Sequence, residues 1–289
     1  MEIAVASGKG GTGKTTVAAA LGQVLHDLGW KTILLDADVE SPNAKVYLKP
    51  DLNEQAVVAL PVPEIIPERC DGCGTCSRVC QFHALVFLQG RPVVFPELCH
   101  GCGSCGLVCD RGAIREKPFA IGTLRGGMTP AGIHFAEGEL DIGRPLGVPV
   151  IGELKGWKSL PNAEWRVVDA PPGASCPVVE SIRGADFVIL VTEPTPFGLH
   201  DLKKAVSLAG ELEIPAGVVI NRDGIGDQHV ERYCREFGLP ILLRIPFEEE
   251  IGAGLARGLT LLEIRPAYRG HFQRMVEKIQ DAADGEKSG

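Results

Sequence analysis

The sequence predicts an α/β fold built on a doubly wound, mostly parallel sheet that is interrupted by a small cysteine-rich insertion. Short apolar stretches alternate with helix-like stretches along most of the 289 residues, and this alternation is typical of a parallel sheet covered by helices. A glycine-rich loop between the first strand and the first helix has the spacing of a phosphate-binding loop. Two cysteine runs of identical spacing break the alternation between residues 61 and 118.

The first elements are a strand over residues 2–7, a helix that ends near Gly29 and a strand over residues 31–38. The second strand is apolar without alternation, which favours a central parallel position. Four later stretches share that character and end at Asp, Pro or Asn, namely "WRVVDAPPG", "DFVILVTEPT", "AGVVIN" and "LPILLRIP". Helical patterns such as "FGLHDLKKAVSLAGEL" and "DQHVERYCREFG" lie between them.

The glycine-punctuated stretch over residues 118–143 is expected to be a hairpin that returns to the main sheet. Near the C-terminus an apolar stripe is expected to pack on the sheet; it comprises Phe272, Met275, Val276 and Ile279. We therefore expect residues 1–60 and 119–289 to form one domain and residues 61–118 to form an inserted one. The insertion reads as two similar halves of roughly 30 residues, and bound metal would explain how so small a segment folds.

The amino-acid composition indicates which binding partners and which cellular compartment to expect. Hydrophobic residues make up 45% of the chain and the net charge is −8, so nucleic acid and anionic membranes are not expected partners. No apolar run approaches the roughly 20 residues that span a bilayer, and no secretory signal opens the sequence. We expect a cytoplasmic protein, and a reducing cytosol argues against disulfides among its ten cysteines.

The glycine-rich loop "SGKGGTGKTT" satisfies the pattern Gly8-x-x-x-x-Gly13-Lys14-Thr15. Its backbone N–H groups and the following helix N-terminus would hold phosphate oxygens. Lys14 is expected to reach the β and γ phosphates, Thr15 to bind Mg²⁺ and Thr16 to help with the α phosphate. The nucleotide-binding loop residues are Gly8, Lys9, Gly10, Gly11, Thr12, Gly13, Lys14, Thr15 and Thr16. A structural glycine turn before an ordinary helix is the alternative.

The stretch "KGGTGKT" resembles the deviant Walker A motif of the MinD/ParA/Mrp family of P-loop ATPases. The resemblance implies a P-loop NTPase fold, ATP or ADP as ligand, and ATP-dependent homodimers in which Lys9 reaches the phosphates bound by the partner subunit. A solvated surface lysine is the alternative for Lys9. Spacing alone does not separate ATP from GTP, so ATP follows from the resemblance.

Other positions match this family one by one. The resemblance implies that Asp38 orients the attacking water, so the expected catalytic residues are Lys9, Lys14 and Asp38. Asp169 would reach Mg²⁺ through water, and Asp36 would support Mg²⁺ or shape the strand end. The expected magnesium residues are therefore Thr15, Asp36 and Asp169. Asn221 would recognise adenine. The aspartates follow parallel strands, whose carboxyl ends line the ligand crevice of this architecture.

The cysteine runs "CDGCGTCSRVC" and "CHGCGSCGLVC" each have the pattern C-x₂-C-x₂-C-x₃-C. They resemble two-cluster bacterial ferredoxins, in which the fourth cysteine of each run ligates the other cluster. The insertion is therefore expected to be a small α+β ferredoxin-like domain with two [4Fe–4S] clusters. Cluster 1 would bind Cys70, Cys73, Cys76 and Cys109, and cluster 2 would bind Cys80, Cys99, Cys102 and Cys105. The usual proline after the fourth cysteine is replaced by Gln81 and Asp110. Cys₄ zinc sites are the alternative.

Three further residues, His100, Cys176 and Cys234, have side chains that can bind metal. His100 follows a predicted ligand, but we interpret it as a turn residue. Cys176 follows "DAPPG", near where the related nitrogenase iron protein holds a cluster between subunits, and we expect it to be a small buried residue here. Cys234 is expected to pack in the core.

With its insertion, the chain resembles MinD-superfamily ATPases that contain a ferredoxin domain. This resemblance implies an ATPase whose nucleotide state controls electron transfer to a redox or metal-cofactor protein. A second hypothesis is a carrier of Fe–S or other metal clusters of the Mrp type, although no C-x-x-C pair follows Cys109. A third is a spatial-positioning ATPase of the MinD/ParA type that senses redox state.

Overall fold

The computed structural model describes residues 1–286, with side chains described through residue 283, and contains a nine-stranded sheet. The strand order is β11-β10-β9-β1-β8-β2-β7-β6-β3, and the strands from β11 to β7 are parallel. The parallel strands are β1 (Glu2–Ala6), β2 (Thr32–Asp36), β7 (His134–Leu140), β8 (Trp165–Asp169), β9 (Phe187–Thr192), β10 (Ala216–Asp223) and β11 (Ile241–Pro246). The predicted mostly parallel sheet is confirmed.

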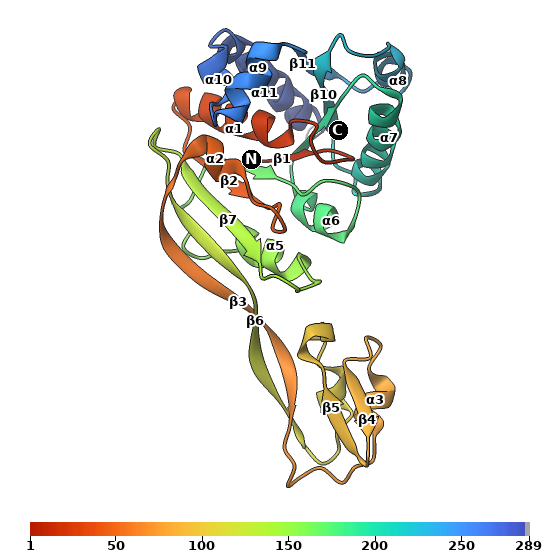
Figure 1. The fold of residues 1–289 in the computed structure, drawn as a ribbon. Coiled ribbons are helices and arrows are strands. Elements are labelled where there is room, and N and C mark those ends of the chain that lie inside the picture. Colours follow the sequence, from red (N-terminus) through yellow and green to blue (C-terminus); the bar gives the residue numbers. More distant parts are fainter. Residues whose placement is uncertain (287–289) are drawn as a thin grey trace.

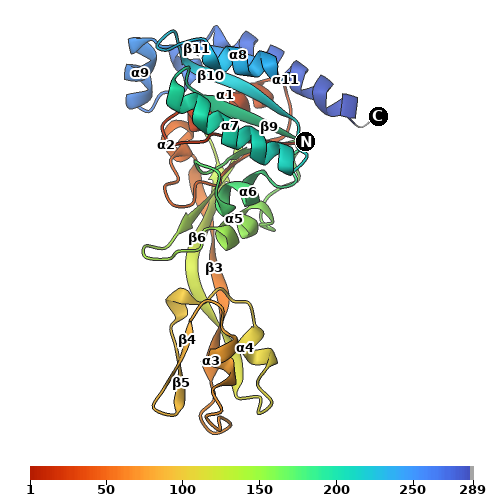
Figure 2. The same ribbon diagram turned by 90° about the vertical axis from the view of Figure 1, so that its right-hand side faces the viewer.

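Helices cover both faces of this sheet, as doubly wound topology requires (Figures 1 and 2). One face carries α1 (Lys14–Asp27), α2 (Ala44–Leu48), α9 (Glu249–Ala256), α10 (Leu261–Ile264) and α11 (Tyr268–Glu286). The other carries α5 (Val148–Lys155), α6 (Cys176–Ile182), α7 (Pro196–Glu211) and α8 (His229–Glu236). Among the helices that the structure describes, none has the length and apolar character of a membrane span.

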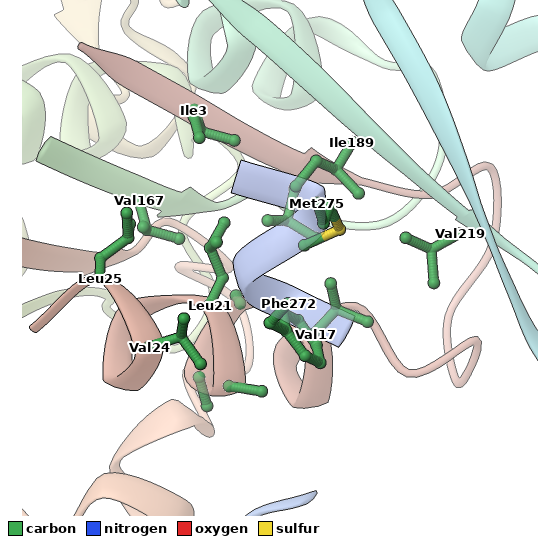
Figure 3. Packing of buried hydrophobic residues seen from close by; sticks show 14 of the residues in the cluster. Ile3, Val17, Leu21, Val24, Leu25, Val167, Ile189, Val219, Phe272 and Met275 are labelled. Atoms are coloured by element: carbon green, nitrogen blue, oxygen red, sulfur yellow. The ribbon is translucent and has the colours of Figure 1, made fainter. Parts of the chain in front are cut away.

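The core on the α1 face shows why the C-terminal helix is part of the fold. Phe272 and Met275 of α11 are fully buried and lie between α1 and the sheet, close to Leu21 and Ile189 (Figure 3). Val276 and Ile279 are buried in the same cluster, so the predicted packing of this stripe is confirmed. Burying an aromatic or aliphatic side chain of this size contributes about 1.5–3 kcal/mol. The last three residues of the sequence lie outside the described residues.

Two long antiparallel strands, β3 (Asp51–Ile65) and β6 (Ile114–Met128), project from the sheet. β6 pairs with β7 only from Gly122 to Met128, which confirms the predicted hairpin, and beyond that it pairs with β3 alone. This two-stranded arm, defined here as β3 together with β6, carries residues 66–113 away from the sheet (Figures 1 and 2). Both domain boundaries expected from the sequence fall within the arm.

The segment at the end of the arm contains short elements around the cysteines. They are α3 (Thr75–Val79), β4 (Leu85–Leu88), β5 (Arg91–Val94), a 3₁₀ turn (Pro96–Leu98) and α4 (Ser104–Leu107). Each short helix starts after a glycine in the left-handed region, Gly74 at φ 72° and Gly103 at φ 71°. The halves differ after that point, because the first run leads into the β4–β5 hairpin and the second into β6. The predicted repeat therefore applies to the cysteine loops alone.

Candidate nucleotide site and cysteine-rich centre

The glycine-rich loop connects β1 to α1 at the carboxyl edge of the sheet. Gly13 has φ 94°, and a Cβ atom there would lie 2.3 Å from Nδ2 of Asn221. Only glycine satisfies both the backbone conformation and this close approach. A cavity of about 520 Å³ opens over the loop, and its lining includes these predicted residues: Gly10, Gly11, Gly13, Lys14, Thr15, Thr16, Asp38 and Asn221. The loop, the strand before it and the helix after it therefore form a site large enough for a bound ligand.

The far wall of this cavity comes from residues that sequence reasoning missed. Pro246 ends β11, Phe247 follows it, and Ile251 and Leu255 come from α9. The exposed fraction of Phe247 is 61%, so its ring is available to a planar ligand. The sequence "LPILLRIP" could have indicated this wall, because the carboxyl end of this parallel strand must lie at the same edge of the sheet as the phosphate loop.

Lys14 and Asp169 meet beneath the loop. The Nζ atom of Lys14 lies 3.4 Å from Oδ1 of Asp169, and both residues are buried. Oδ2 of Asp169 has no hydrogen-bond partner within residues 1–283. Asp36 is the register partner of Asp169 on the neighbouring strand. The predicted magnesium residues Asp36 and Asp169 thus lie side by side at the strand ends, with one carboxylate oxygen available.

The carboxyl group of Asp36 organises the segment that follows β2. Its oxygens accept the backbone N–H of Asp38 at 3.2 Å, of Asn43 at 2.8 Å and of Ala44 at 2.9 Å. Complete burial, and next the negative charge of Asp169, raise the pKa of Asp36 to about 8. Burial likewise raises the pKa of Asp38 to about 6. A divalent cation would relieve this crowding of carboxylates.

The raised pKa of Asp36 predicts a pH dependence of stability. In the unfolded chain this carboxyl ionises near its ordinary value of 3.8, whereas in the folded protein it holds its proton up to about pH 8. The folded state therefore binds more protons between these values, and the contribution of Asp36 to stability is lost as the pH rises through this window. Thermal unfolding of nucleotide-free wild type and Asp36→Asn should show a wild-type advantage that shrinks from about pH 4 to pH 8. A pH-independent difference would contradict this assignment.

Lys9 is held within its own chain by a partner that the sequence reading did not identify. Its Nζ atom lies 2.8 Å from Oε2 of Glu193, a buried residue that follows β9. The guanidinium of Arg222 contacts the other oxygen of the same carboxylate. Glu193 stands in "VTEPT" at a strand end, and the carboxyl-edge rule that picked out the aspartates would also have selected it. The resemblance implies that Lys9 reaches another subunit, whereas here its charge is paired within its own chain.

Asn221 joins the end of β10 to the phosphate loop. Its Nδ2 atom donates to the carbonyl oxygen of Thr12 at 2.7 Å, and its Oδ1 atom accepts from the backbone N–H of Arg222. The side chain also lines the nucleotide cavity. The side chain therefore ties the phosphate loop to the end of β10.

The eight cysteines of the two runs divide between two cavities at the end of the arm. The larger, of about 350 Å³, is lined by Cys80, Cys99, Cys102 and Cys105. The smaller, of about 20 Å³, is lined by Cys70, Cys73, Cys76 and Cys109. None of the eight forms a disulfide. Each cavity therefore contains the first three cysteines of one run and the fourth of the other.

The donors around these cavities suit a group bound by several thiolates. The backbone N–H of Gly101 donates to Sγ of Cys99 at 3.4 Å, and that of Ala113 donates to Sγ of Cys109 at 3.3 Å. Burial raises the pKa of the thiols of Cys99 and Cys105, and binding to metal would offset that cost by stabilising the thiolates. In the described part of the chain, no three His, Cys, Asp or Glu side chains are grouped to hold a single metal ion. The chemistry of the donors fits iron–sulfur clusters, for which the smaller cavity would have to widen.

The other three residues considered in the sequence, His100, Cys176 and Cys234, differ in burial and contacts. The His100 ring stacks on Phe82 with 3.6 Å between centroids, at the wall of the larger cavity. Cys234 is buried in α8, as expected. Cys176, in contrast, is exposed, so the expectation of a buried residue was wrong. It opens α6, whose buried face is formed by Val178, Ser181 and Ile182, and the first residue lies off that face.

Comparison with known proteins identifies the family to which this fold and site belong. The sequence pattern of the CobQ/CobB/MinD/ParA nucleotide binding domain matches residues 3–261. The chain belongs to this family. It has the nucleotide-binding fold of the P-loop ATPases of the MinD/ParA type, as predicted from "KGGTGKT".

Three relatives show how far the similarity extends. An uncharacterized protein of Methanocaldococcus jannaschii is 34% identical and aligns with 91% of this chain and 92% of its own. The iron-sulfur cluster carrier protein of the same organism is 24% identical, over 99% of this chain and 86% of its own. The septum site-determining protein MinD of Pyrococcus horikoshii, solved with Mg-ADP, has a TM-score of 0.59 at 20% identity, covering 98% and 96% of the two chains.

Proposed function

We propose that this protein is a Mg²⁺-dependent ATPase that couples its nucleotide state to electron transfer through two [4Fe–4S] clusters to a partner protein. The observation that carries this proposal is the division of the eight cysteines between two cavities on an arm that continues two strands of the nucleotide-binding sheet. The proposed phosphate site and the proposed electron-transfer site are thereby connected through one hydrogen-bonded sheet.

At the nucleotide site, the backbone N–H groups of the loop hold the phosphates and Lys14 turns from Asp169 toward them. Asp38 positions water for attack on the γ-phosphorus, and the bond to the β-phosphate oxygen breaks to release ADP and phosphate. Thr15, Asp36 and Asp169 would hold Mg²⁺, which would supply positive charge against the developing negative charge on the phosphates. Lys9 completes the site of a second subunit after it leaves Glu193, so dimerisation accompanies ATP binding. Asn221 contacts the adenine.

At the end of the arm, residues 61–118 form the electron-transfer domain. The first cluster would be held by Cys70, Cys73, Cys76 and Cys109, and the second by Cys80, Cys99, Cys102 and Cys105. The clusters supply one-electron chemistry. The chain supplies amide hydrogen bonds to sulfur and the apolar surroundings that tune the reduction potential.

The deciding experiment is an EPR-monitored potential titration of anaerobically reconstituted protein, with and without Mg²⁺ and a non-hydrolysable ATP analogue. We expect the nucleotide to change the potential or the line shape of at least one cluster; about 59 mV would be a tenfold change in a one-electron equilibrium. Sedimentation of the same samples should show a nucleotide-dependent dimer that Lys9→Ala does not form. Identical titrations with bound nucleotide would contradict the coupling.

A second candidate is a cluster carrier, favoured by the iron-sulfur cluster carrier protein of M. jannaschii that aligns over nearly the whole chain. The electron-transfer proposal and the carrier proposal differ in how tightly the protein would bind its clusters. A carrier should transfer its clusters to an apo-ferredoxin upon mixing, whereas clusters held by two sets of four thiolates should stay with the chain through repeated turnover.

A further inference from the structure

A chain of charged groups connects the nucleotide cavity to the arm. Residues 37–44 follow β2 and contain Asp38, and their end is bound by the carboxyl group of Asp36 through the N–H groups of Asn43 and Ala44. Lys45 comes next, in the first turn of α2, and its Nζ atom lies 2.9 Å from Oε1 of Glu137. Any shift of this segment toward a bound nucleotide therefore acts on the Lys45–Glu137 pair.

Glu137 is the junction of this chain. It lies on β7, completely buried, as the register partner of Asp36 on one side and of Arg125 of β6 on the other. The Nη1 atom of Arg125 lies 3.4 Å from the same Oε1 atom that Lys45 contacts, and it also contacts Glu139. A buried carboxylate without a cation is strongly unfavourable. If Lys45 moves, Glu137 and Arg125 must move with it, or the buried carboxylate of Glu137 loses one of its two cationic partners.

The backbone reinforces the link at both ends. The N–H of Leu140 at the end of β7 donates to the carbonyl oxygen of Val39 at 2.8 Å, so residues 37–44 are also hydrogen-bonded to β7. Beyond Arg125, β6 continues as one strand to Ile114 at the cysteine-rich segment, with one register shift in its pairing to β3 between Gly122 and Ala120. The preceding residue, Ala113, donates its N–H to Sγ of Cys109. One strand therefore joins Arg125 to a cysteine of the smaller cavity.

We propose that Lys45, Glu137 and Arg125 are positioning residues that transmit the rearrangement of residues 37–44 upon nucleotide binding to the arm, and so move the cysteine-rich segment. The proposal rests on the proposed nucleotide-coupled function and deepens it by naming its mechanical route. Packed strands and buried ion pairs shift between discrete arrangements, which allows a small change at one end to reach the other.

Hydrogen–deuterium exchange of the cluster-loaded protein, with and without Mg²⁺ and a non-hydrolysable ATP analogue, tests this route. It measures the protection of backbone amides and uses no signal from the clusters. In the wild type the nucleotide should change exchange in residues 37–44 and also in the arm. In Arg125→Gln the change in residues 37–44 should persist and the change in the arm should be lost. Arg125→Lys, which keeps the cation, should restore it.

The matched control is Arg115→Gln. Arg115 lies on the same strand and pairs with Glu64, but it is exposed and outside the chain of contacts. It should leave the arm response unchanged. Lys45→Gln interrupts the route at its other end and serves if Arg125→Gln does not fold.

The outcomes separate this inference from the proposed function. A wild-type arm that does not respond to bound nucleotide, or an arm that responds equally in Arg125→Gln, would overturn the route. An arm that responds in the wild type and not in Arg125→Gln would support the route even if the EPR titration showed no change, and only the electron-transfer proposal would then fail.

Discussion

Replacing Lys14 with alanine should lower ATP turnover on the order of 10²- to 10³-fold, the cost typical of removing one preorganised group that stabilises transition-state charge. The amino group lies 3.4 Å from the carboxylate of Asp169 within a buried site. Its loss would remove the proposed contact to the transferring phosphoryl group and the ion pair with Asp169 beside Asp36. Phosphate release under saturating Mg²⁺ and ATP measures the effect.

The control for this substitution is Lys31→Ala. Lys31 is exposed and precedes β2, at the amino edge of the sheet, opposite the phosphate loop. Its turnover should match the wild type. Turnover of Lys14→Ala within a few-fold of the wild type would show that the loop is not the hydrolytic site.

Removal of single cysteines should halve the iron content in a pattern that reveals the crossed ligation. Two clusters correspond to about eight iron atoms per chain, and Cys109→Ala should reduce this to about four, because one cluster loses a thiolate. Cys109 lines the cavity of Cys70, Cys73 and Cys76 although it belongs to the other run. Iron and acid-labile sulfide assays of anaerobically reconstituted protein measure this loss.

Double variants make the test decisive. Cys70→Ala with Cys109→Ala removes two ligands of one cluster and should lose no more iron than either single variant. Cys70→Ala with Cys80→Ala removes one ligand from each cluster and should lose nearly all the iron. If ligation follows the runs instead, the two double variants exchange their results. Cys176→Ala, an exposed cysteine outside both runs, should keep the full complement.

The strands and helices around the phosphate loop were predictable because local physics determines them. Continuous apolar runs ending at polar residues specify buried parallel strands. The stretch "SGKGGTGKTT" specifies its own turn, since Gly13 must adopt a positive φ. The cysteine spacing likewise fixes the two loops, each opened by a glycine before a short helix.

The arm was less accessible to sequence reasoning. Residues 51–65 and 114–128 are separated by the whole cysteine-rich segment, and only their long-range pairing extends them beyond the main sheet. The expected boundaries at residues 61 and 118 follow the composition, whereas the strands continue through both. Pairing between distant strands is a property of the folded chain.

The family, the phosphate loop, the carboxylates at the strand ends and the grouping of the cysteines could be predicted before the fold was known, because each depends on residues close together in the chain or on a recurrent strand-end position. The pairing of Lys9 with Glu193, and the position of Glu137 between Lys45 and Arg125, became evident only in the folded chain. Those contacts join residues that are 184, 92 and 12 positions apart, and buried carboxylates acquire their cations only when the sheet brings distant strands together.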